Sequence, residues 1–250
     1  MYTNDLNPVF LSMGPVELRY YGLVYFLGFL LAWIYLKKSA MGKKTFKNKE
    51  HADDFIFYIM LSSILSARLF YIIFYNLQFY SSNPLEIFKF WHGGMSVHGG
   101  IFGAILGTFW FIRKYKESKY KILQLSDMMA IPLAIGLAFG RIANFINGEL
   151  YGRITSLPWG VKFKSAEGFR HPSQLYESLK NFLIVFLLTL KSKKPFRQGE
   201  LSALFLIYYA ILRFLIEFVR EPEISFGIFT MGQVLSIPMF ILGVWMYRKI

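Results

Sequence analysis

Residues 128–152 read MMAIPLAIGLAFGRIANFINGELYG, an apolar run that ends in a cluster of charged, amide and glycine residues. Thirteen uncharged residues, from Met128 to Gly140, precede Arg141. If that run lies in a bilayer, the guanidinium of Arg141 lies at the edge of the hydrocarbon or within it. A charge in that position is costly, and by default it is functional and paired with an anionic group. The stretch therefore predicts a membrane fold and a site for an anion.

Further apolar segments lie on both sides of this run in the sequence. Of the 250 residues, 55% are hydrophobic and 19% aromatic, which is too apolar for a soluble domain of this length. Seven segments have about the length of a spanning helix, namely residues 20–36, 54–75, 97–112, 122–145, 175–190, 201–219 and 231–247. The sequence thus predicts an all-α polytopic integral membrane protein with seven transmembrane helices, forming a single domain over residues 1–250.

The basic residues predict the orientation of these helices. The net charge is +13, and Lys and Arg gather in short blocks between apolar segments, which favours membrane topology over nucleic-acid binding. Residues 37–50, 113–121, 191–198 and 248–250 contain 17 of them, whereas residues 1–19, 76–96, 146–174 and 220–230 contain 7. Because the cytoplasmic side carries the excess, we expect the N-terminus outside and the C-terminus in the cytoplasm. Residues 146–173 are then a small extracytoplasmic cap between segments four and five.

The N-terminal residues give no sign of a removable signal peptide. Met1 to Arg19 includes Asp5 and Glu17, and it has neither a basic start nor a small-residue cleavage site before the first apolar run. We therefore expect the first apolar segment to remain as a membrane helix.

Charged residues inside the predicted helices indicate what the protein binds. Arg213, Glu217 and Arg220 are four and three residues apart, so they share a helix face and can form a ladder of ion pairs. One reading is a neutralised stripe that holds helices together. With Arg68 and Arg141, however, the interior has an excess of cations, and guanidinium groups suit a phosphate bound through two parallel hydrogen bonds. An anionic ligand is therefore expected.

Glycines and histidines mark a second region. Gly99, Gly103 and Gly107 recur every four residues, which predicts close packing against another helix. His98 lies between two glycine pairs in GGMSVHGG, residues 93–100. Such a histidine more often bonds two helices than it catalyses, although an imidazole can move a proton near neutral pH.

The sequence predicts no metal site and no cofactor. His92, His98 and His171 lack the spacing of a metal-binding helix. The chain has no cysteine, which excludes a disulfide framework, a thiolate metal site and a cysteine nucleophile of its own.

The order of motifs along the chain resembles the prolipoprotein diacylglyceryl transferase family. The motifs are YYGL at 20–23, GGMSVHGG at 93–100, GRIANFINGELYG at 140–152, HPSQLYE at 171–177, RFLIEFVR at 213–220 and MGQ at 231–233. Together they extend over essentially the whole chain in one register.

The resemblance implies an enzyme of the bacterial cytoplasmic (inner) membrane. The asymmetry of Lys and Arg places Arg141, and with it the expected active site, towards the outer leaflet. Such an enzyme transfers the sn-1,2-diacylglyceryl group of phosphatidylglycerol to the lipobox cysteine thiol in the signal peptide of a prolipoprotein, which forms a thioether and releases glycerol-1-phosphate. It is the first step of lipoprotein biosynthesis. The expected partners are these two substrates and membrane lipids, with no nucleic acid.

The resemblance also assigns residues. Arg141 and Arg213 match arginines expected to bind the phosphate, and His98 matches a histidine expected to take the thiol proton or to orient the group that does. Residues expected to shape the headgroup pocket are Tyr21, Asn144, Glu149, Gly152, Glu177, Tyr209, Glu217 and Arg220, and Arg141 belongs to this substrate-binding set as well. For Glu149 and Glu217 the alternative is a purely orienting role.

Two other classes of protein remain as alternatives. A transporter of an anionic lipid or a small anion would also need buried arginines, and it would be favoured by two related halves, of which the sequence shows no sign. A structural scaffold would predict fully paired charges, which the cation excess contradicts.

Overall fold

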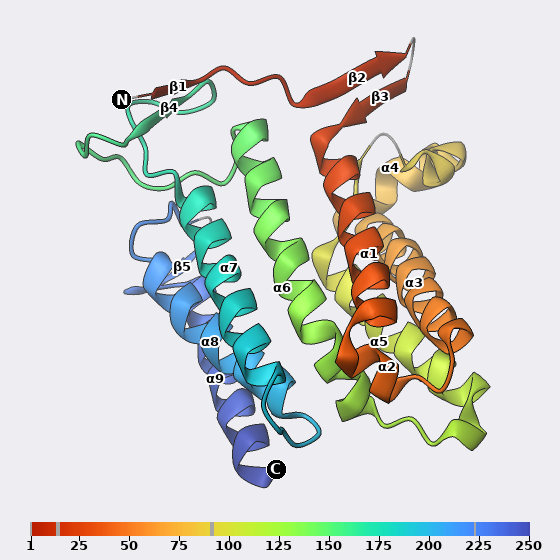
Figure 1. Ribbon diagram of the computed structural model, residues 1–250. Coiled ribbons are helices and arrows are strands. Elements are labelled where there is room, and N and C mark those ends of the chain that lie inside the picture. Colours follow the sequence, from red (N-terminus) through yellow and green to blue (C-terminus); the bar gives the residue numbers. More distant parts are fainter. Residues whose placement is uncertain (1, 14–15, 91–92, 223) are drawn as a thin grey trace. The chain divides into compact units, whose positions relative to one another are not determined.

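The computed structural model describes residues 2–13, 16–90, 93–222 and 224–250 (Figure 1). A helix covers six of the seven predicted segments completely, and the helix in the sixth segment, 201–219, ends at Ile216. These helices are α1 (Tyr20–Lys38), α3 (Lys49–Tyr75), α5 (Val97–Lys114), α6 (Ile122–Asn147), α7 (Ser173–Ser192), α8 (Glu200–Ile216) and α9 (Met231–Lys249). The predicted helix positions are confirmed, although several ends differ by a few residues.

The start of α3 illustrates why the ends differ. The prediction placed it at residue 54, but the Asn48 side chain accepts a hydrogen bond from His51 N and so caps a helix that begins at Lys49. The first turns of α3 are polar and contact other parts of the chain: Asp53, for example, accepts a hydrogen bond from Lys37 Nζ of α1 (2.8 Å). Hydropathy alone does not reveal a polar helical extension of this kind.

Shorter elements connect these helices. They are the helices α2 (Ala40–Thr45) and α4 (Leu77–Ser82), the 3-10 helices η1 (Pro84–Phe88) and η3 (Lys116–Ser118), and the strands β1 (Tyr2–Asn4), β2 (Val9–Met13), β3 (Val16–Arg19), β4 (Val161–Phe163), β5 (Ser225–Phe226) and β6 (Phe229–Thr230). The strands form three two-stranded pairs within the described residues. The fold is therefore mostly helical rather than purely helical.

The N-terminal segment joins the 146–173 region, a contact that the sequence did not predict. Strand β1 pairs in parallel with β4, with Tyr2 opposite Val161 and Asn4 opposite Phe163. The buried Asn4 side chain donates to the carbonyl oxygen of Phe145 near the end of α6 (2.5 Å). The first residues of the chain thus hold the loop that follows α6 (Figure 1).

The chain divides into two compact units, of which unit 2 comprises Ala32–Leu125. Helices α3 and α5 pack against each other here. Gly99, Gly103 and Gly107 are buried on α5, and a side chain on Gly103 would collide with the backbone at Ser62 and Ser63 of α3. The predicted packing role of these glycines is confirmed.

Unit 1 comprises Met1–Leu31 and Ser126–Ile250. Helices α7 and α8 pack together, as do α8 and α9 (Figure 1). Near the start of α6, buried Asp127 accepts hydrogen bonds from Gly199 N (2.6 Å) and Ser202 N (2.8 Å) at the start of α8. These bonds fix the register of α8 against α6.

The helices carry the surface of a membrane protein. Among the helices of the described residues, α3 and α6 are long enough and apolar enough to cross a membrane. Large apolar side chains are also exposed on the other long helices, including Phe26 of α1, Trp110 of α5, Leu179 of α7 and Ile241 of α9. An apolar surface of this extent is stable against lipid rather than water.

Candidate functional site

Buried Glu177 is the centre of an ion-pair cluster in unit 1. It lies in the second turn of α7 with 1% of its surface exposed. Its two oxygens bind arginines from different helices, Arg141 Nε of α6 at 2.9 Å and Arg213 Nη1 of α8 at 2.6 Å. The two arginines that the sequence placed at the phosphate therefore converge on one carboxylate.

A second carboxylate extends the cluster. Glu217, just after the last turn of α8, pairs with Arg213 Nη2 and lies 3.5 Å from Arg220 Nη1. Arg220 Nη1 is also 3.7 Å from Glu177 Oε1. The predicted ladder of Arg213, Glu217 and Arg220 is confirmed, and it is joined to Glu177.

Thr230 holds the other oxygen of Glu217 and was not predicted. Its hydroxyl donates to Glu217 Oε2 (2.6 Å), and it is also the N-cap of α9, where it forms a capping box with Gln233. A side chain on Gly232 would collide with the Glu217 carboxyl group. The MGQ motif at 231–233 therefore begins α9 directly against the cluster.

The end of α6 places two further predicted residues beside Arg141. Asn144 Oδ1 accepts from Arg141 Nη1 (3.3 Å), and Asn144 Nδ2 donates to Glu149 Oε1 (2.7 Å). Gln174 Nε2 of α7 donates to the Glu149 carbonyl oxygen (2.6 Å). Asn144 and Glu149 are thus connected to the cluster through Arg141, in the orienting arrangement that the sequence left open for Glu149.

Gly152 joins the 146–173 region to Arg220. The two residues form an antiparallel bridge, and Gly152 N donates to His171 O (2.8 Å). A Cβ atom on Gly152 would lie 2.5 Å from Val219 O and 2.6 Å from His171 Cβ. Only glycine allows this approach, so Gly152 sets the position of Arg220.

Tyr209 lies one turn before Arg213 on α8 and contacts a lysine that the sequence analysis did not single out. Lys180 Nζ of α7 lies 3.7 Å from the centre of the Tyr209 ring. Lys180 is the one charged residue between Glu177 and Lys191 in the sequence, which is the signal that could have identified it.

Two other predicted residues are not part of the described cluster. His98 lies in the first turn of α5, in unit 2, and its side chain is exposed within that unit. Tyr21 lies in the first turn of α1, but its side chain is outside the part of the chain that the structure describes. His92 also lies outside the described residues.

The prediction that Arg68 adds to a cation excess for an anionic ligand is wrong. This side chain, 2% exposed in unit 2, donates to backbone carbonyl oxygens of Glu86 (2.5 Å), Ile87 (3.1 Å), Lys89 (3.2 Å) and Gly94 (3.2 Å), as well as to Gly93 O. Its donors are used by the loop between α4 and α5. Gly94 has φ +76°, and a side chain there would collide with Arg68, so the glycines admit an arginine of the protein rather than a ligand.

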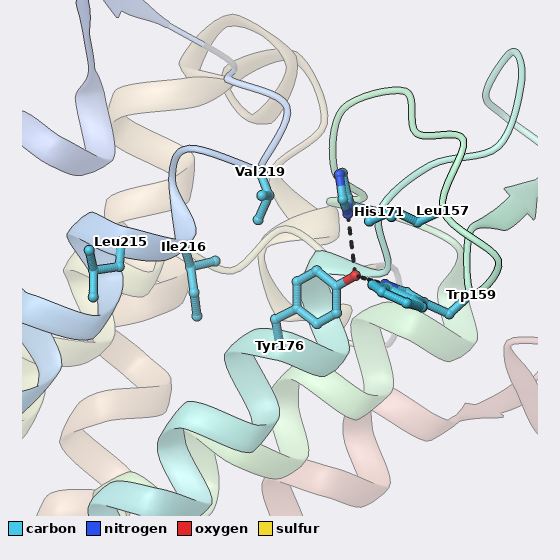
Figure 2. A pocket seen from close by; sticks show the side chains of 7 residues that line it. All are labelled: Leu157, Trp159, His171, Tyr176, Leu215, Ile216 and Val219. Carbon is cyan, nitrogen blue, oxygen red and sulfur yellow. Dashed lines mark hydrogen bonds between the residues drawn. The ribbon is translucent and has the colours of Figure 1, made fainter.

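An open apolar pocket of about 510 Å³ is formed by the 146–173 region, the start of α7 and the end of α8 (Figure 2). It is lined by Leu157, Trp159, His171, Tyr176, Leu215, Ile216 and Val219. The Tyr176 hydroxyl accepts from Trp159 Nε1 (2.8 Å) and lies 3.3 Å from His171 Nδ1 (Figure 2). Partial burial lowers the pKa of His171 and so favours its neutral form.

The cluster can bind an anion through its guanidinium groups. Arg141, Arg213 and Arg220 contribute three positive charges, and Glu177 and Glu217 contribute two negative charges. In the part of the chain described, no group of three His, Asp or Glu side chains is arranged to hold a metal ion. Positive charge held in place in this way can stabilise an anion.

Comparison with known proteins identifies the family. The sequence model described as prolipoprotein diacylglyceryl transferase matches residues 8–248. The chain belongs to this family. The resemblance predicted from the motifs is thus confirmed, and the match includes every residue of the cluster.

Curated relatives agree with this assignment. This family member is 42% identical to a protein of Legionella pneumophila, over 97% of this chain and 96% of the relative. It is 42% identical to a protein of Geobacter sulfurreducens (96% and 94%) and 44% identical to one of Rickettsia felis (96% and 95%). Each relative is named phosphatidylglycerol–prolipoprotein diacylglyceryl transferase. These names support the transferase reading and not the transporter alternative.

Proposed function

We propose that the protein transfers the sn-1,2-diacylglyceryl group of phosphatidylglycerol to the lipobox cysteine of a prolipoprotein, releasing glycerol-1-phosphate. The observation that carries this proposal is the convergence of Arg141 and Arg213 on Glu177, with Arg220 within 3.7 Å of the same carboxylate. Family membership supplies the reaction, and the cluster supplies the charge that it needs.

The leaving group explains why the site holds arginines. A sulfur–carbon bond forms at the glyceryl carbon, the carbon–oxygen bond to phosphate breaks, and the electron pair remains on the phosphate oxygen. Negative charge therefore grows on the phosphate during the reaction. Guanidinium groups already fixed by Glu177 and Glu217 stabilise that charge without reorganising. Arg141 and Arg213 are assigned to the phosphate on this ground.

The substrate thiol needs a base. A free thiol with a pKa near 8.5 is only a few per cent ionised at neutral pH, so a base contributes roughly two to four orders of magnitude. His98 is assigned this role from its motif, which matches that of the family. Its exposure within unit 2 leaves the imidazole accessible to a substrate.

The remaining residues shape the headgroup site. Asn144 and Glu149 orient Arg141 through the hydrogen bonds at the end of α6. Gly152 positions Arg220, and Glu217 orients Arg213. Tyr21 and Tyr209 are assigned to the same pocket from their matching motif positions.

The membrane arrangement completes the proposal. The seven long helices span the bacterial cytoplasmic membrane as one domain, with the N-terminus outside and the C-terminus in the cytoplasm. The connecting segments on the same side of the membrane as the C-terminus carry the excess of Lys and Arg, which supports this orientation. Residues 146–173 then form an extracytoplasmic cap, and the arginine cluster lies towards the outer leaflet, where a prolipoprotein presents its cysteine.

The decisive test is a reconstitution. Purified protein in detergent is incubated with phosphatidylglycerol and a peptide that carries a lipobox cysteine. We expect release of glycerol phosphate together with a thioether-linked peptide, both dependent on the cysteine. A peptide with serine in place of cysteine is the control. Binding of phosphatidylglycerol without any product would overturn the proposal, and lipid transfer across vesicles that contain the protein would then indicate a transporter.

A further inference from the structure

Two successive contacts connect the buried faces of α7 and α8. Glu177 and Lys180 are three residues apart on α7, and Tyr209 and Arg213 are four apart on α8, so each pair shares a helix face. Arg213 Nη1 binds Glu177 Oε1 at 2.6 Å. One turn deeper, Lys180 Nζ lies 3.7 Å from the Tyr209 ring centre. Lys180 therefore adjoins the arginine cluster.

Lys180 lacks the partners that a buried ammonium normally has. The residue is 4% exposed, and its Nζ atom has no hydrogen-bond partner among the described residues. Lysines at membrane borders extend their ammonium group to water, but the buried side chain of Lys180 does not reach it. A contact with an aromatic ring stabilises a desolvated ammonium by less than the cost of removing that ion from water. Tyr209 alone thus does not account for the position of Lys180.

The nearest carboxylate is already engaged. Glu177 attracts the Lys180 charge, while Arg141, Arg213 and Arg220 repel it. Glu177 also binds Arg141 at 2.9 Å and Arg213 at 2.6 Å. When Lys180 is protonated, its ammonium is therefore a positive charge that the two glutamates leave uncompensated.

The charges fit the departing product better than the substrate. When Lys180 is protonated, the cluster holds four cations and the two glutamates, an excess of two positive charges. The phosphodiester of phosphatidylglycerol carries one negative charge. A phosphate monoester carries two above its second pKa of about 6. Without Lys180 the excess matches the phosphodiester, and with Lys180 it matches the monoester.

We propose that Lys180 is a positioning residue whose ammonium compensates the second negative charge that appears on glycerol phosphate as it leaves. It acts through the guanidinium cluster rather than by direct contact with the reacting atoms. This inference rests on the proposed transferase function. It assigns Lys180 to the bond-breaking step and not to binding of the intact lipid.

The test compares two soluble anions at pH 7, where glycerol-1-phosphate is mainly a dianion and glycerophosphoglycerol is a monoanion. Their binding to purified protein in detergent is measured by calorimetry in wild type, Lys180→Met and Lys180→Arg. We expect wild type to prefer the dianion. Lys180→Met should weaken dianion binding about tenfold or more and monoanion binding far less. Lys180→Arg, which retains the charge, should keep most of the preference.

Kinetics give a second readout. With phosphatidylglycerol and a lipobox peptide, Lys180→Met should lower kcat about tenfold while KM for the lipid stays close to wild type. Lys194→Met, at an exposed position beyond the end of α7, is the matched control and should change neither quantity. If Lys180→Met does not fold, Lys180→Gln takes its place in both measurements.

The outcomes separate this inference from the function on which it rests. Equal weakening of both anions, or a wild type without preference for the dianion, overturns the role of Lys180. Unchanged anion preference and normal kcat in Lys180→Met overturn it while the transferase function stands. A dianion preference that depends on Lys180, in a protein that forms no thioether product, supports the charge assignment and overturns the function.

Discussion

Two regions of this protein bury arginines in opposite ways. In unit 2, Arg68 is surrounded by backbone carbonyl oxygens of residues 86–94 and lies over the rings of Tyr80 and Phe90, at 5.1 and 5.5 Å from their centres. In unit 1, Arg141 and Arg213 share the carboxylate of Glu177. Both arrangements satisfy a buried guanidinium, yet only the second gathers several charges in one place.

The difference separates an arginine that holds a loop from arginines that we propose to bind a ligand. The carbonyl oxygens around Arg68 are neutral dipoles of one loop. They occupy the Arg68 donors, and these hydrogen bonds hold the loop in place. Glu177 and Glu217 hold three arginines together, and like charges this close are stable only with anionic partners. A buried arginine is therefore informative about ligands through its neighbours, not through its burial.

The largest expected effect is at Arg213. We expect Arg213→Lys to lower kcat/KM for transfer about a hundredfold to a thousandfold, because lysine cannot bind Glu177, Glu217 and phosphate with one planar group. Release of glycerol phosphate measures the effect. Arg248→Lys, at an exposed position near the end of α9, is the control. Near-normal transfer by Arg213→Lys would mean that Arg213, like Arg68, has only a structural role.

Arg68 should show the opposite behaviour. We expect Arg68→Lys to destabilise the protein by about 2–4 kcal/mol, because an ammonium has too few donors for the carbonyl oxygens around it. Thermal unfolding in detergent measures the loss. Activity per folded molecule should stay close to that of wild type. A folded Arg68→Lys protein as inactive as Arg213→Lys would mean that Arg68 takes part in the reaction.

A smaller effect is expected where α5 packs on α3. Gly103→Ala should destabilise by about 1–3 kcal/mol, because the new methyl group meets the backbone at Ser62. Gly100→Ala is the matched control, since its Cβ has Ala67 Cβ as nearest neighbour at 3.9 Å, and its effect should be below about 0.5 kcal/mol. The difference between their unfolding temperatures is the measurement. Equal effects would show that α3 and α5 pack less closely than described.

The sequence predicted those parts of the site that depend on local spacing. Arg213, Glu217 and Arg220 follow one another at helical intervals, so their ion pairs could be read directly. Thr230 and Lys180 were missed because their roles depend on a partner elsewhere in the chain, Glu217 and Tyr209 respectively. The interpretation of Arg68 was wrong for the same reason, since no local pattern shows which carbonyl oxygens a loop will present.

The sequence by itself determined the positions of the long helices and the family, because apolar length, basic blocks and motif order are properties of the chain alone. It also supplied the arginines. The tertiary structure decided which charges meet. Packing of α7 against α8 brings Glu177 to Arg213, 36 residues later, and the end of α6 adds Arg141. Side chains this far apart in sequence become neighbours only through helix packing. Their electrostatic interaction depends on the distance between them in space, which the sequence does not state.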